Sequence, residues 1–94
     1  SGFFYALEGI YFVYPNTESG DGRPDLILKP LDRTRPAYIF ELKKLKTNDI
    51  EKEAEKAFEQ IEEKKYDTIL INEGIKDIIK IGLVFDGKKA VAYY

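Results

Sequence analysis

The sequence predicts an α/β domain in which helices flank a mixed β-sheet. Three β-type segments come first, an amphipathic helix follows, and two more β-type segments end the chain. A helix between the third and fourth strands provides a crossover that makes those two strands parallel, whereas short connections favour antiparallel neighbours. The chain has 94 residues, of which 44% are hydrophobic, so it can form one small domain with a real core.

The N-terminal part predicts a helix end, a strand and a loop. Residues 3–7 are apolar and fit the last turn or two of a helix, with Gly9 at the C′ position. We therefore expect a truncated first helix and a chain that is a fragment of a longer protein, and the Ser-Gly start without any Met points the same way. Residues 10–14 combine aromatic and β-branched side chains, which favours a strand, and the polar residues 16–22 favour a loop.

Two further strands follow, joined by a connection of hairpin length. Residues 25–31 and 37–45 are both rich in apolar β-formers, and Pro36 stands just before the second segment. The polar residues 31–35 between them suit a hairpin loop. The second segment starts with consecutive apolar positions, which predicts a central strand covered on both faces.

The clearest helix pattern spans residues 48–65. Its apolar positions recur at helical spacing: Ile50, Ala54, Ala57, Phe58 and Ile61. Asn48, with Glu51 three residues later, predicts an N-cap with a return contact. Acidic residues in the first turn and lysines in the last turn suit the helix dipole.

The C-terminal part predicts a final hairpin. Residues 66–75 fit either a strand or a short helix that ends at Gly74, and residues 78–85 fit a strand. Asp86-Gly87 is a hairpin turn signal, so residues 89–94 are expected to return as the last strand. The predicted order is helix, three strands, helix, short helix and two strands.

Composition narrows the chemistry that the domain can perform. The chain has no His and no Cys, which excludes serine–histidine triads, histidine or thiolate metal sites and thiol nucleophiles. Acid–base or metal chemistry must therefore use Asp, Glu, Lys or Tyr. The net charge is −2, so binding of nucleic acid through overall charge is not expected. We expect a cytoplasmic protein without membrane contact, because no apolar run reaches the ~18 residues of a membrane span.

Ionisable residues interrupt two of the predicted strands. Asp25 opens one of them, and Glu41 and Lys43 lie within the next. Side chains alternate across a strand, so Glu41 and Lys43 point to the same face, and pairing of the two strands as a hairpin can bring Asp25 beside them. Two converging carboxylates carry a desolvation cost, and a divalent cation between them is the simplest compensation.

These residues carry a resemblance to a known family. Gly22-Arg23-Pro24-Asp25 followed by Glu41-Leu42-Lys43 resembles the signature of the PD-(D/E)XK nuclease superfamily. Three further segments resemble one branch of it, which is often found C-terminal to an AAA-ATPase-like domain. They are Asn16–Arg23, Ala57–Ile61 with Tyr66, and Ile81–Phe85 with Gly87-Lys88. The resemblance covers nearly the whole chain from Phe3 and implies a restriction-endonuclease-like fold, with residues 1–94 as a single nuclease-like domain.

The resemblance implies a role for each matching residue. Asp25 and Glu41 would hold Mg²⁺ or Mn²⁺, with the backbone carbonyl of Leu42 as a third ligand. Lys43 would orient or help to deprotonate the attacking water and would offset phosphate charge. Glu18 is a further candidate metal ligand. Arg23 and Gln60 are candidate substrate-binding residues, although Arg23 fits an ion pair within its loop equally well and Gln60 also fits a surface amide.

The implied activity is metal-dependent phosphodiester hydrolysis of nucleic acid, DNA rather than RNA. The superfamily usually begins with a fuller helix that often bears a glutamate for the metal site, and only the tail of such a helix fits this sequence. The main alternative is therefore a catalytically inactive module of the same fold that serves an upstream ATPase-like domain or self-association as a homodimer. A weaker alternative is a buried Glu41–Lys43 pair with a structural role alone.

Overall fold

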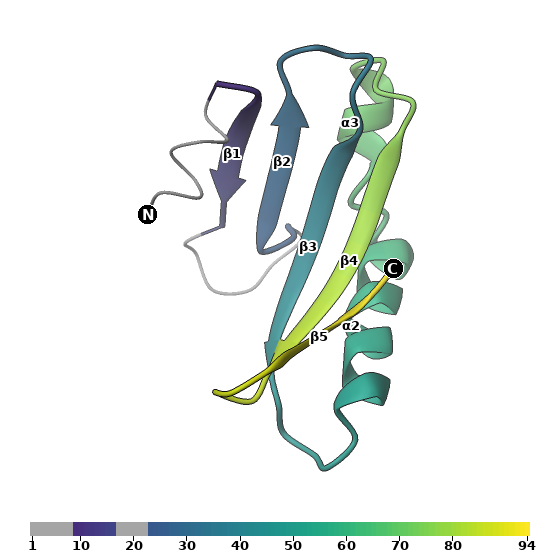
Figure 1. Cartoon of the computed structure of the whole chain (residues 1–94). Coiled ribbons are helices and arrows are strands. Elements are labelled where there is room, and N and C mark those ends of the chain that lie inside the picture. The colour runs from purple at the N-terminus through teal and green to yellow at the C-terminus, as the bar shows by residue number, and fades with distance from the viewer. Residues whose placement is uncertain (1–8, 17–22) are drawn as a thin grey trace.

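A single mixed sheet organises the part of the chain that the computed structural model describes, residues 9–16 and 23–94. Its strands follow one another across the sheet in chain order (Figure 1). They are β1 (Tyr11–Pro15), β2 (Leu26–Pro30), β3 (Ala37–Lys44), β4 (Ile78–Phe85) and β5 (Ala90–Tyr93). Strands β3 and β4 are parallel and the other neighbours are antiparallel. The predicted α/β class with a mixed sheet is confirmed.

Two helices cover one face of this sheet. Helix α2 (Ile50–Lys64) is the crossover between β3 and β4, and the short helix α3 (Thr68–Asn72) follows it (Figure 1). The segment whose sequence fits either a strand or a helix is therefore helical, and Gly74 follows it with φ +89°. The expected N-terminal helix end at residues 3–7 lies outside the described residues.

The core forms between β3 and the two helices. Its buried side chains come from segments far apart in the sequence: Ala37, Ile39, Ile61, Tyr66, Leu70 and Ile75. The contact of Leu70 with this cluster explains why the ambiguous segment folds as a helix, because burial of that side chain outweighs local strand propensity. Tyr66, which the family resemblance also includes, packs within this core.

The start of α2 corrects the predicted cap. The N-cap is Asp49 rather than Asn48, and its carboxylate accepts a hydrogen bond from the Lys52 amide at 3.1 Å. Glu53, rather than Glu51, reaches back, and its Oε2 accepts from the Thr47 amide at 2.7 Å. Both acids satisfy amides at the helix start, as the sequence pattern predicted, but the register is shifted because the helix begins at Ile50.

Close packing of α2 on the sheet depends on Gly82. A Cβ atom at this position would lie 2.2 Å from the carbonyl oxygen of Ala54 and 2.5 Å from the amide nitrogen of Phe58. Both atoms belong to the backbone of α2, so the helix itself would have to move away. The absence of a side chain at Gly82 therefore sets the distance between α2 and β4, the strand that contains Gly82 and lies beside Glu41.

Gly82→Ala is expected to lower the free energy of unfolding by about 2 kcal/mol, because overpacking against rigid backbone forces the helix to shift. Urea unfolding of the parent and the variant measures this loss. Gly9→Ala is the matched control, since a Cβ at Gly9 meets nothing within 4 Å. Equal stability losses in the two variants would contradict this account of the helix contact.

Candidate functional site

The strand register brings Asp25 opposite Glu41. In the antiparallel pair of β2 and β3, Leu26 lies opposite Phe40. Asp25, which precedes Leu26, therefore lies opposite Glu41, which follows Phe40. The Leu42 amide donates a hydrogen bond to Oδ2 of Asp25 at 2.7 Å. The Asn16 amide donates to the backbone carbonyl of Asp25 at 2.8 Å, which ties the end of β1 to the same point.

Glu41 is a buried carboxylic acid in an unfavourable environment. Its exposed fraction is 7%, and burial together with the neighbouring Asp25 carboxylate raises its pKa to about 7, while Lys43 opposes this rise. Its Oε1 atom is buried and has no hydrogen-bond partner among the described residues. Unpaired buried carboxylate oxygens are costly, so Glu41 is held where a cation would be stabilising.

The donor atoms at this point fit a hard divalent cation. Mg²⁺ and Mn²⁺ prefer oxygen ligands, and the site offers two carboxylates, one of them with an orphaned oxygen. Within residues 9–16 and 23–94, no cluster of three or more His, Cys, Asp or Glu side chains suits a metal. Among the described residues, a backbone carbonyl could supply a further ligand, and water usually completes the coordination of Mg²⁺.

Lys43 shares the strand face of Glu41 and opens onto a polar pocket. This pocket has a volume of about 300 Å³ and lies between the C-terminal end of β3 and α2. It is lined by Leu42, Lys43, Lys44, Lys46, Glu53 and Lys56. Four lysines around one acid make this surface locally positive in a chain of net charge −2. No ion pair between two described residues includes Glu41 or Lys43, so the structural ion-pair alternative gains no support.

Gln60 lies on the flank of α2 that is turned away from β5. Phe58, on the opposite flank by helical spacing, packs edge-on against Tyr93 of β5 with ring centroids 5.2 Å apart. Gln60 is therefore directed to the side of the sheet that carries Asp25. No hydrogen bond in the described part of the chain joins it to either carboxylate, so its role remains a prediction. Glu18 lies outside the described residues.

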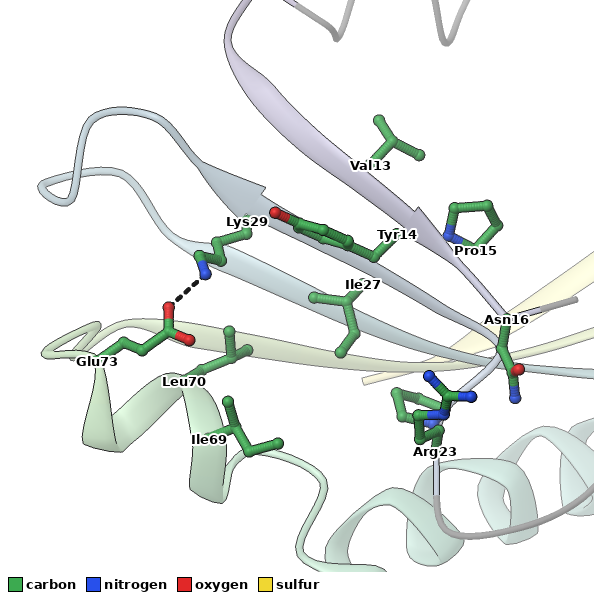
Figure 2. Close-up of a pocket in the computed structure, with 11 residues that line it drawn as sticks. Val13, Tyr14, Pro15, Asn16, Arg23, Ile27, Lys29, Ile69, Leu70 and Glu73 are labelled. Carbon is green, nitrogen blue, oxygen red and sulfur yellow. Dashed lines mark ion pairs between the residues drawn. The ribbon is translucent and has the colours of Figure 1, made fainter. Parts of the chain in front are cut away.

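A second pocket, which the sequence did not reveal, opens directly beside Asp25. It has a volume of about 360 Å³ and lies between the sheet and α3 (Figure 2). Its lining residues come from β1, the loop that ends at Pro24, β2 and α3. They are Val13, Tyr14, Pro15, Asn16, Arg23, Pro24, Ile27, Lys29, Ile69, Leu70 and Glu73. The predicted substrate-binding residue Arg23 belongs to this pocket.

Comparison with protein families identifies one match. A family model of the PD-(D/E)XK nuclease superfamily matches residues 1–93. No curated protein and no solved structure matches the chain. Neither helix in the described part of the chain is long and apolar enough to span a membrane.

Proposed function

The chain belongs to the PD-(D/E)XK nuclease superfamily, and from this premise we propose that it cleaves phosphodiester bonds of DNA with the help of Mg²⁺ or Mn²⁺. Members of the superfamily typically use divalent metals, and their restriction-endonuclease-like fold agrees with the mixed sheet and helices of this chain. The observation that carries the proposal is the buried, unpartnered Oε1 of Glu41 beside the carboxylate of Asp25. We propose that residues 1–94 form one nuclease-like domain.

Three groups are proposed to hold the metal: the carboxylates of Asp25 and Glu41 and the backbone carbonyl of Leu42, with Glu18 as a further candidate. A bound divalent cation would polarise the phosphate and lower the pKa of a bound water. The hydrogen bond from the Leu42 amide supports this assignment, because it fixes the Asp25 carboxylate against β3. Preorganised ligands reduce the cost of assembling such a site.

The remaining residues are proposed to position water and substrate. Lys43 lies on the face of Glu41, where its ammonium can hold the attacking water and offset charge that develops on the phosphate. Lys44, Lys46 and Lys56 line the same pocket and provide cations for flanking phosphates. Arg23 and Gln60 are proposed to contact the substrate from the two sides of Asp25.

Partners follow from the resemblance to one branch of the superfamily. We propose that the domain works beside an upstream AAA-ATPase-like domain, and that it acts as a homodimer. The net charge of −2 supports dependence on a partner for initial capture of nucleic acid, because long-range attraction to a polyanion is absent.

Lys43→Gln is expected to reduce Mg²⁺-dependent cleavage of DNA by about 100-fold, because a positioned proton-transfer group contributes on this scale. Gel assays with single-stranded and duplex DNA, with Mg²⁺, Mn²⁺ or a chelator, measure the rates. Lys76→Gln is the control, since Lys76 is exposed and lines neither pocket beside the site.

Two outcomes would count against parts of this proposal. Equal rates for Lys43→Gln and Lys76→Gln would remove Lys43 from the mechanism. Absence of cleavage by the parent, together with no Mg²⁺ or Mn²⁺ binding in calorimetry, would favour a catalytically inactive module of the same fold.

A further inference from the structure

The pocket beside Asp25 has apolar walls that face each other. Figure 2 shows Tyr14 and Ile27 extending from the sheet, with Ile69 and Leu70 opposite them on α3. Ile69 is 69% exposed and Tyr14 is 50% exposed. A large aliphatic side chain and an aromatic ring thus meet water at the rim of a concave site. Such a surface is typical of a site for a flat apolar group.

Basic side chains lie at both ends of this pocket. At the end away from the acid pair, Lys29 and Glu73 form an ion pair, and Arg33 also contacts the Glu73 carboxylate at 3.8 Å. The two cations and one anion leave a net positive charge at this end. At the other end Arg23, two residues before Asp25, lines the pocket (Figure 2). The pocket therefore has an apolar interior with basic side chains at both ends, which suits a ligand with an apolar ring and an anionic group.

The pocket is aligned with the acid pair along one strand. Asp25, just before β2, and Ile27 and Lys29 within it are alternate residues, so their side chains lie on the same face of the sheet. Successive side chains on that face are about 7 Å apart. The Asn16 amide, from a residue that lines the pocket, donates its hydrogen bond to the Asp25 carbonyl. A ligand held between Tyr14 and Ile69 would thus lie next to whatever the acid pair binds.

We propose that this pocket receives the base of a nucleotide adjacent to the phosphate that is cleaved, an inference that rests on the proposed function. The base packs against Tyr14, Ile27 and Ile69, and Arg23 contacts a substrate phosphate. A base stacked inside a duplex cannot enter a pocket bounded by a helix and a sheet. The substrate class is therefore single-stranded or locally unpaired nucleic acid, which binds through stacking on exposed rings.

Methyl NMR on the full chain without metal tests the pocket independently of cleavage. Deoxyadenosine 5′-monophosphate is expected to shift the methyl signals of Ile27, Ile69 and Leu70, while deoxyribose 5-phosphate leaves them unchanged. Ile71 is the internal reference, because it is also exposed on α3 but does not line the pocket. Equal shifts with both compounds would overturn the proposal, since they would indicate a phosphate site without base recognition.

Variants extend the test to oligonucleotides. Tyr14→Ala and Ile69→Ala are each expected to weaken binding of single-stranded DNA by about 10-fold, with Tyr14→Phe retaining binding and Ile71→Ala unchanged. An abasic nucleotide next to the cleaved phosphate should weaken the parent to the same degree. Three results would overturn the inference: equal losses in the two isoleucine variants, no methyl shifts in a parent that cleaves DNA, or contacts between Ile69 and another segment of the same chain. A parent that shows base-dependent shifts but no cleavage would instead contradict the nuclease activity alone.

Discussion

Glu41→Gln is expected to lower metal-dependent cleavage by at least about 10³-fold, because it removes the negative charge of a proposed metal ligand that is buried in the site. Gln keeps the size of the side chain but supplies a neutral oxygen and an amide. Lewis-acid stabilisation by a bound cation is worth several kcal/mol, and each 1.36 kcal/mol changes a rate tenfold. Single-turnover rates at saturating Mg²⁺ measure the loss without interference from product release.

The control for this prediction is a glutamate on helix α2. Glu62 pairs with Lys80 at 2.7 Å and lines neither the lysine pocket nor the pocket beside Asp25. Glu62→Gln should therefore cleave like the parent. Asp25→Asn should lower the cleavage rate as Glu41→Gln does, because the two carboxylates are proposed to share one ion. A parent-like rate in Glu41→Gln would exclude this site as the place of cleavage.

The location of the acid pair was predictable from the sequence because two simple rules combine. Alternation places Glu41 and Lys43 on one face, and antiparallel pairing across a short connection brings Asp25 opposite Glu41. The structure realises the pairing through the Leu26–Phe40 register. The roles assigned to these residues come from the family resemblance and remain proposals.

Other features could not be predicted because the sequence leaves them balanced. Asn48 and Asp49 are both good caps and differ by one position, so the local sequence does not decide that Asp49 is the N-cap. The segment containing α3 has apolar β-formers at consecutive positions, and its helical form depends on the contact of Leu70 with the core. The pocket beside Asp25 is formed by residues of β1, β2 and α3, and no local sequence pattern predicts that these elements come together.

Burial of Glu41 should also make stability depend on pH in the metal-free protein. Its pKa is about 7 when folded, against a usual value of 4.5, so the folded state holds a proton more tightly than the unfolded chain. The contribution of Glu41 to the free energy of unfolding is therefore greatest below about pH 4.5. It falls as the pH rises through 7 and is constant at higher pH. A shift of this size corresponds to roughly 3 kcal/mol, since each pKa unit is worth 1.36 kcal/mol.

Glu41→Gln should remove this dependence, because glutamine resembles the protonated acid and cannot ionise. Urea unfolding with a chelator should give equal stability for parent and variant near pH 4.5, and a variant that is more stable by roughly 3 kcal/mol at pH 8. Adding Mg²⁺ at pH 8 should narrow the difference by stabilising the parent alone. If the free energies of unfolding of parent and variant changed with pH in parallel, ionisation of Glu41 would not destabilise the folded state. The expected gain in stability with loss of cleavage would instead indicate that the fold tolerates a buried charge because catalysis requires it.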